Sequence, residues 1–286
     1  MTAPHRREHL MKARASIALT TTALALTAVV VPAAHADDRP TGSAAAAAPS
    51  GPKISNVSVN GGKDVTVGVS HRTFTVTFTV RDPEGIKGGI AALWRGGPDA
   101  YRSDKLLGPA DYATPESQCK RVDSTTSRCS VKLHADTDAP PEMPEDNLQN
   151  ADAGRWNLVV RAEDQAGSVT ENHKVTTHLV KRAAKVTANA SPEPIKKGKT
   201  LTVAGSLTRA NWDTLKYAGF ASGAVKLQFK KNGATRWETV KTVSADSRGK
   251  VKATTKASVD GSYRFTYGGT TSTGSASSKA DAVNVT

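Results

Sequence analysis

The chain has 286 residues, of which 37% are hydrophobic and 23% charged, and its formal net charge is +13. This length suggests two domains of ordinary size once an N-terminal signal is removed. No long apolar run follows that signal, which excludes a further membrane-spanning helix, and two cysteines are too few for a thiol-rich metal site.

The N-terminus has the three-part pattern of a secretory signal peptide. Basic residues precede the uncharged stretch 16–31, and the small residues Ala34 and Ala36 then flank His35 in an A-x-A cleavage site. We therefore expect cleavage after Ala36, which would make residues 1–36 a signal peptide and the mature protein secreted and extracellular. The low-complexity segment 37–52 would follow as a linker.

Beyond this linker, the first half of the chain alternates apolar and polar residues with period two, which is typical of strands with one buried face. The stretches "RTFTVTFTV" and "GRWNLVVRAED" show the pattern most clearly. The positions that we expect to face the core are Phe74, Val76, Phe78 and Val80 in the first stretch, and Trp156, Leu158, Val160 and Ala162 in the second.

Cys119 and Cys129 are the only cysteines, and nine residues separate them. No His or Cys stands at ligand spacing beside them, and a redox pair usually reads C-x-x-C. In an exported chain such a pair favours a structural disulfide. We expect it to close an antiparallel hairpin with its loop at 123–125, and to lie on the core side together with Val131 and Leu133.

Three turns share the pattern Asp-x-x-Gly directly after a strand: "DPEG" at 82–85, "DQAG" at 164–167 and "DSRG" at 246–249. Asp at the first position accepts hydrogen bonds from the turn, and Gly at the fourth adopts the left-handed conformation. This turn chemistry is the favoured interpretation. The alternative is that carboxylates at these loop ends supply oxygen ligands to calcium.

A stronger calcium candidate is the acidic loop 134–154, although it lacks the ordered spacing and the glycine of an EF-hand. We select as possible ligands Asp136, Asp138, Glu142 and Asp146.

Charge divides the mature chain near "KRAAK", residues 181–185. Residues 37–180 contain 16 Lys and Arg against 19 Asp and Glu, whereas residues 181–286 contain 19 against 6. The predicted organisation is therefore a disulfide-bonded sandwich at 53–180, a short linker at 181–184 and a basic sandwich at 185–286.

The basic half also alternates with period two, and its expected core positions include Leu201, Val203, Leu207, Val225, Leu227, Phe229, Val251, Ala253, Tyr263, Phe265 and Tyr267. The basic residues opposite them could bind extracellular polyanions, with a salt-sensitive affinity. These candidates are Lys226, Lys230, Lys250, Lys252, Lys256 and Arg264. The alternative is that lysine-rich faces only keep the protein soluble and prevent its sheet edges from pairing with other chains.

The segment 211–220 is the best candidate for a single helical turn, which would close one end of the second sandwich. Its aromatic residues Trp212, Tyr217 and Phe220 could stack on sugar rings, but packing beneath their own loop is favoured.

Motifs of common enzyme classes are missing from the sequence. It contains neither a G-x-S-x-G elbow nor an H-E-x-x-H zinc motif. "KKGKT" at 196–200 precedes a strand instead of opening a helix, unlike a phosphate-binding loop. None of the histidines after the signal forms an evident dyad with a nucleophile. We predict no catalytic residue.

Several stretches together resemble a family of secreted proteins of Gram-positive bacteria. They include "FTVTFTVRDPEGI", the C-x9-C hairpin, "NASPEPIKKGKTLTVAGSLTRANWDTLKYAG" and "VKTVSADSRGKVKATTKASVDGSYRFTYGG". The resemblance covers nearly all of residues 53–286. The family is uncharacterised, and its members often carry the label "calcium-binding protein". It implies two immunoglobulin-like domains after a signal peptide and carries over no catalytic residue.

These observations predict an all-β protein with two immunoglobulin-like antiparallel β-sandwich domains in tandem after a signal peptide. We expect a non-catalytic binding or adhesion protein without a cofactor, whose basic domain addresses a cell-wall or other extracellular polyanion. Calcium binding and an enzyme site not visible in the sequence are the alternatives. We expect neither a membrane span nor sequence-specific nucleic-acid binding.

Overall fold

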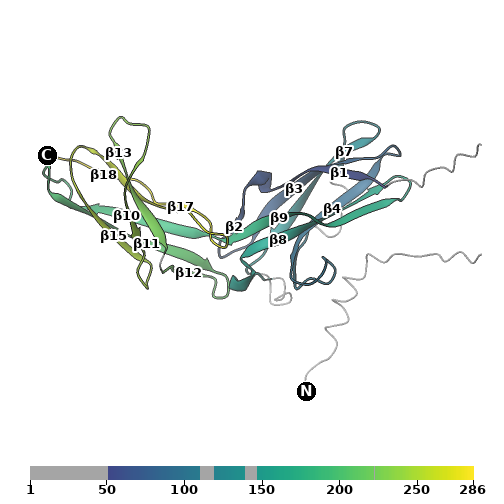
Figure 1. The fold of residues 1–286 in the computed structure, drawn as a ribbon, viewed down its shortest axis with the longest axis horizontal. Helices are drawn as coiled ribbons and strands as arrows, with labels where there is room; N and C mark the ends of the chain where they lie inside the picture. The colour runs from purple at the N-terminus through teal and green to yellow at the C-terminus, as the bar shows by residue number, and fades with distance from the viewer. Residues whose placement is uncertain (1–50, 110–118, 139–146, 222) are drawn as a thin grey trace, which may run out of the picture. The chain divides into compact units, whose positions relative to one another are not determined.

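The computed structural model describes residues 51–109, 119–138, 147–221 and 223–286, so the predicted signal peptide and most of the linker lie outside the described part. Most of the described residues lie in strands (Figure 1). Their only helical elements are two single 3-10 turns, η1 (Asn60–Gly62) and η4 (Asn150–Asp152). In these ranges no helix is long and apolar enough to cross a bilayer.

The first sandwich consists of two sheets. One sheet has the order β1 (Lys53–Val59), β3 (Arg72–Arg81), β7 (Thr126–Ala135) and β6 (Cys119–Arg121). The other has the order β2 (Val65–Val67), β9 (Val169–Arg182), β8 (Gly154–Asp164), β4 (Ile86–Arg95) and β5 (Lys105–Leu107). All neighbours are antiparallel except β2 and β9, which are parallel.

This strand order is that of an immunoglobulin domain. Strands β1-β3-β7-β6 correspond to A-B-E-D, and β9-β8-β4 correspond to G-F-C. Short strands extend the second sheet on both sides, β2 beside strand G and β5 beside strand C. The predicted fold class is therefore confirmed by connectivity.

The second sandwich again consists of a four-stranded and a five-stranded sheet. One sheet contains β10 (Ala184–Ser191), β11 (Thr200–Asn211) and β15 (Lys250–Lys256), with β12 (Lys216–Gly219) paired to the end of β11. The other contains β14 (Glu238–Ser244), β13 (Ala224–Lys231), β16 (Gly261–Tyr267), β17 (Ala276–Ser277) and β18 (Asp281–Val283). These sheets correspond to A-B-E and C′-C-F-G.

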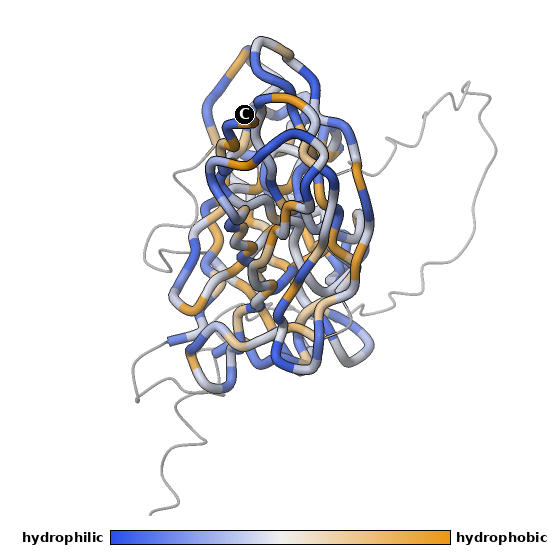
Figure 2. Tube along the Cα trace, turned by 90° about the vertical axis from the view of Figure 1, so that its left-hand side faces the viewer, coloured by the Kyte–Doolittle hydropathy of each residue, from blue (hydrophilic) through white to orange (hydrophobic). Residues whose placement is uncertain are grey.

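Each sandwich has its own hydrophobic core, and the alternation of the sequence determines which residues enter it. All eight core positions predicted for β3 and β8 are buried, and so are those predicted in the second sandwich except Phe229, which is half-buried against that core. In Figure 2 hydrophilic and hydrophobic residues alternate along the chain trace, as strands with one buried face require.

The disulfide joins Cys119 and Cys129 across the β6–β7 hairpin, as predicted. Cys129 is completely buried in the first core beside β4. At Gly89 of β4, an added Cβ would lie 2.9 Å from the Phe78 ring and 3.3 Å from the Cys129 sulfur. Only glycine therefore leaves room for the disulfide and Phe78 to pack between the sheets.

Residues Gly51–Thr286 form one compact unit, and the connection between the sandwiches is short. Strand β9 runs through Arg182 and β10 begins at Ala184, so the range 181–184 that was predicted as a linker is strand apart from Ala183. The Ala183 N–H donates to the Val67 carbonyl (2.8 Å) and its own carbonyl accepts from the Ala210 N–H (2.8 Å). The backbone at the connection is thus hydrogen-bonded to both sandwiches.

The segment 211–220 differs from its prediction. It contains the last residue of β11, a turn at 212–215 and the strand β12, and no helical turn. Trp212 is 2% exposed and belongs to the core of the first sandwich, where its indole N–H donates to the Val67 carbonyl (3.3 Å). It therefore does not pack beneath its own loop. Asn150 of η4 accepts from the Trp212 N–H (3.0 Å) and donates to Asp213, which secures the same contact.

Candidate functional site

The acidic loop 134–154 is only partly described. Glu142 and Asp146 lie outside the described residues. Asp138 is exposed, and Asp136 is half-buried with its carboxylate 3.9 Å from Nδ1 of His134. Neither aspartate belongs to any cluster of three potential metal ligands in the described part of the chain.

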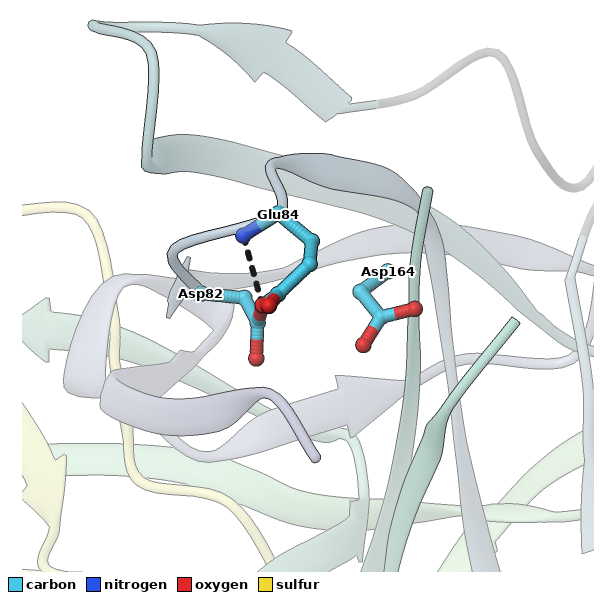
Figure 3. A group of neighbouring side chains, drawn as sticks. All are labelled: Asp82, Glu84 and Asp164. Carbon is cyan, nitrogen blue, oxygen red and sulfur yellow. Dashed lines mark hydrogen bonds between the residues drawn. The ribbon is translucent and has the colours of Figure 1, made fainter. Parts of the chain in front are cut away.

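Two of the three Asp-x-x-Gly turns instead bring a different set of carboxylates together (Figure 3). Single ligand oxygens of Asp82, Glu84 and Asp164 all lie within 4.8 Å of one another. Asp82 follows β3 and Asp164 ends β8, and both strands end at the same side of the first sandwich. The Gln165 N–H donates to the Gly85 carbonyl (3.1 Å), which joins the two turns directly.

Turn chemistry explains why aspartate stands at both positions. The Glu84 N–H donates to Oδ1 of Asp82 (3.0 Å), shown by the dashed line in Figure 3, and the Ser168 N–H donates to Oδ1 of Asp164 (2.7 Å). The fourth residues, Gly85 and Gly167, have φ angles of 84° and 89°. The third turn, at Asp246, has the same geometry, so the favoured interpretation of all three is confirmed.

The cluster has an unusual charge environment. Asp82 and Asp164 are 2% and 1% exposed, whereas Glu84 is exposed. A hydrogen bond shared with the Asp82 carboxyl, together with the nearby negative charges, raises the pKa of Glu84. None of the ion pairs among the described residues includes a member of the cluster. Three carboxylates suit a hard cation such as Ca²⁺, which would take its other oxygen ligands from water or backbone carbonyls.

The basic candidates of the second sandwich lie on two different sheets. Lys250, Lys252 and Lys256 are exposed on the outer face of β15. Lys226 and Lys230 are on the outer face of β13, and Arg264 is on the adjacent strand β16. All six alternate with the buried positions of their strands, as the sequence predicted, and they are divided between two sheet faces.

Trp237 adds an aromatic group to the second of these faces, and sequence reasoning missed it. The Arg264 guanidinium carbon lies 4.1 Å from the centroid of the Trp237 ring, and the Lys230 ammonium lies 5.1 Å from it. Trp237 directly precedes β14, and the pairing of Glu238 with Phe229 places it beside β13. Only this cross-strand register reveals the contact, and the sequence does not provide it.

The aromatic residues that the sequence did single out are engaged within the fold. Tyr217 packs against the first core, and the Lys185 ammonium lies 3.8 Å from its ring centroid. Phe220 packs against the second core, with Arg209 over its ring at 4.1 Å. Together with buried Trp212 they leave no aromatic face on 211–220 for a sugar ring.

One polar group on the first sandwich has residue types found in active sites. The Tyr101 hydroxyl donates to the Glu171 carboxylate (2.6 Å), and Nε2 of His173 lies 3.5 Å from the same carboxylate. Burial and the neighbouring Glu171 raise the pKa of Tyr101 to about 12. This shift favours the neutral phenol, which is the opposite of what an activated nucleophile or base requires. The group instead holds the loop before β5 against β9.

No family model matches the chain, and no curated protein matches it in sequence. Solved structures with similar folds include the full ectodomain of mouse nectin-like molecule 4 (13% identity, 83% of this chain and 65% of that one, TM-score 0.25). Another is Dpr2 Ig1–Ig2 in complex with DIP-Theta (14% identity, 82% of this chain and 98% of that one, TM-score 0.33). A third is the D00-D0 domain of intimin (11% identity, 81% of this chain and 99% of that one, TM-score 0.27). This chain thus spans less than two thirds of the nectin-like ectodomain. These distant likenesses carry no functional argument, and the immunoglobulin-like assignment rests on the strand order described above.

Proposed function

We propose that this protein is a secreted, non-catalytic binding or adhesion protein whose second sandwich attaches to extracellular polyanions. One observation carries the proposal. Residues 181–286 contain 19 Lys and Arg against 6 Asp and Glu, and from Arg182 onward no Lys or Arg among the described residues forms an ion pair. The positive charge of this sandwich is therefore not neutralised internally.

Export is supported by two independent features. The N-terminus has the pattern of a signal peptide, and the chain forms a disulfide that persists in oxidising compartments. Among the described residues no cysteine remains free. The polyanions that such a protein meets are acidic polysaccharides, wall polymers and extracellular DNA.

A binding role also fits the way in which the charges are displayed. The lysines of β13 and β15 point away from the core on regular sheet faces, where neighbouring cations reinforce one another and attract a polymeric anion. The competing interpretation is that these lysines only prevent edge-to-edge association. It predicts no affinity for polyanions beyond that of a protein with balanced charge.

The test is retention of the mature protein, residues 37–286, on a heparin resin and on a teichoic acid resin at low ionic strength. We expect retention that added salt reverses, because exposed charges are screened within a Debye length of about 10 Å at 0.1 M. Passage through both resins at low ionic strength would refute the proposal.

Calcium binding is a second candidate function, favoured by the cluster of Asp82, Glu84 and Asp164. Two buried carboxylates and a third within 4.8 Å, without an ion-pair partner in the described residues, leave negative charge that a divalent cation would neutralise. The loop 134–154 remains a separate prediction, because two of its four candidate ligands lie outside the described residues.

Calcium binding is tested by thermal unfolding in excess calcium and in EDTA. Calcium at 100 times its Kd would stabilise the folded state by about 2.7 kcal/mol. Glu84→Gln should reduce the difference in Tm, because it removes a charge without removing the Glu84 N–H that caps the turn. The control is Asp246→Asn, which alters an equivalent turn in the second sandwich and should keep the full difference in Tm. Identical melting curves of the unmodified protein in calcium and in EDTA would eliminate this candidate.

A further inference from the structure

We infer that the outer face of β14, β13 and β16 in the second sandwich is the binding surface for a linear acidic polysaccharide, with Arg264 as its anion-binding residue. The inference rests on the proposed polyanion binding and specifies where it occurs and which class of polymer it selects. The argument begins with the way in which Arg264 is held.

Arg264 is preorganised by two neighbours on adjacent strands. Its guanidinium stacks on Trp237 at 4.1 Å, and its Nε donates to Oε1 of Gln228 (2.9 Å). These contacts fix the plane of the group and use one of its five N–H donors. Its two terminal nitrogens have no hydrogen-bond partner among the described residues. A stacked arginine with free terminal donors presents the fork that binds carboxylate or sulfate groups in a bidentate manner.

Cations flank this fork along the strand direction. On β13 the outward residues are Lys226, Gln228 and Lys230, and Gln228 is directly opposite Arg264. With a rise of about 3.4 Å per residue, the two lysine positions are about 14 Å apart, one on each side of Arg264. A linear polymer that carries an anionic group at intervals could thus contact several cations at once.

The neutral neighbours favour a polymer rich in hydroxyl groups. Thr266 and Ser262 are the cross-strand partners of Lys226 and Lys230, and Thr242 of β14 is beside Lys226 on the other side. These hydroxyls can both donate hydrogen bonds to sugar hydroxyls and accept from them. Binding of single-stranded nucleic acid instead relies on successive aromatic platforms, and Trp237 is the only aromatic residue at this face in the described chain.

The outer face of β15 carries the same number of cations and provides a matched control. Lys250, Lys252 and Lys256 are opposite Ser206, Ala204 and Thr200 on β11, and no aromatic ring of the described residues lies against these lysines. Both faces offer three positive charges. Only the face of β14, β13 and β16 combines them with a fixed guanidinium.

The experiment compares heparin oligosaccharide binding to the mature protein and to charge-matched variants by isothermal titration calorimetry. The first variant is Lys226→Gln/Lys230→Gln/Arg264→Gln, and the control is Lys250→Gln/Lys252→Gln/Lys256→Gln. We expect the first to lower affinity about tenfold or more, because hydrogen bonds to charged groups are lost, and the control to lower it less than about threefold. Equal losses would overturn the inference while leaving polyanion binding intact.

Two variants separate geometry from charge. Trp237→Ala leaves the charge unchanged and should lower affinity about threefold to fivefold, because Arg264 loses its stacking partner. Arg264→Lys also keeps the charge and should lose most of the contribution of Arg264, because an ammonium cannot form the bidentate fork. Melting temperatures verify that each variant is folded. If Trp237→Ala does not fold, the affinity of Arg264→Lys alone tests the role of the guanidinium geometry. Full affinity in Arg264→Lys would overturn the inference.

A third arm replaces heparin by single-stranded DNA of equal charge. We expect weaker binding of the DNA and no selective loss in Trp237→Ala. Tighter binding of DNA than of heparin would overturn the choice of polymer. Failure of the unmodified protein to bind any polyanion at low salt would instead refute the proposed function itself.

Discussion

Replacement of Trp212 by alanine tests how the two sandwiches are joined. Trp212 lies between β11 and β12 of the second sandwich, yet it is 2% exposed within the core of the first. Truncation of a buried tryptophan to alanine typically costs about 3–5 kcal/mol, because apolar burial is lost and a cavity remains. We expect Trp212→Ala to lower the free energy of unfolding by that amount.

Trp212→Phe is the comparison variant, because it keeps a buried aromatic ring while it removes the indole N–H and part of the ring volume. The Val67 carbonyl that accepts from this N–H also accepts from the Ala183 N–H at 2.8 Å. It therefore keeps a partner, and the loss of this one hydrogen bond should cost about 0.5–1.5 kcal/mol. Both variants lose the indole N–H, so the difference between them reports the packing of the remaining aromatic ring.

The assay is urea unfolding followed by far-ultraviolet circular dichroism, which does not depend on the fluorescence of the residue that is replaced. Trp212→Ala should also broaden or split the transition, because it removes a contact that couples the two cores. An unfolding free energy within about 1 kcal/mol of the unmodified protein, with an unchanged transition, would refute the packing argument.

Three further predictions concern the first sandwich. Replacing Cys119 and Cys129 together by alanine should lower stability by about 2.8 kcal/mol in the chain-entropy model, and an unchanged urea midpoint would contradict it. Gly89→Ala should lower the melting temperature because the added methyl would meet the Phe78 ring at 2.9 Å, and a Tm equal to that of the parent would exclude this crowding. Tyr101 should titrate near pH 12, above its ordinary pKa of 10.0, in a spectrophotometric titration compared with Tyr101→Phe. Because folding raises this pKa, the contribution of Tyr101 to the free energy of unfolding is complete below pH 10 and is lost as the pH rises through about 12. Ionisation of Tyr101 near pH 10 in the folded protein would contradict this prediction.

Local pattern was sufficient to predict much of the fold. Alternation with period two identified the buried positions of β3, β8, β11 and β16, because neighbouring side chains of a strand point to opposite faces. The hairpin register followed from Cys119 and Cys129, since a disulfide places its two residues opposite each other. The Asp-x-x-Gly turns depend on backbone conformations that these residues favour by themselves.

The sites depend on contacts between distant parts of the chain, and the sequence does not contain their geometry. Asp82 and Asp164 meet because the turns after β3 and β8 are hydrogen-bonded to each other. Trp237 reaches Arg264 only through the register of β14, β13 and β16. Trp212 has the apolar character expected of a core residue, but nothing in its neighbourhood indicates that the core belongs to the other sandwich.

The central claim is that the uncompensated charge of the second sandwich binds an anionic polymer. Its most direct test is the Kd of the mature protein for heparin, measured by titration calorimetry over a series of salt concentrations. The account predicts measurable binding at low ionic strength, with an affinity that falls steadily as salt is added. No heat of binding at the lowest salt concentration, or an affinity that salt does not change, would contradict it.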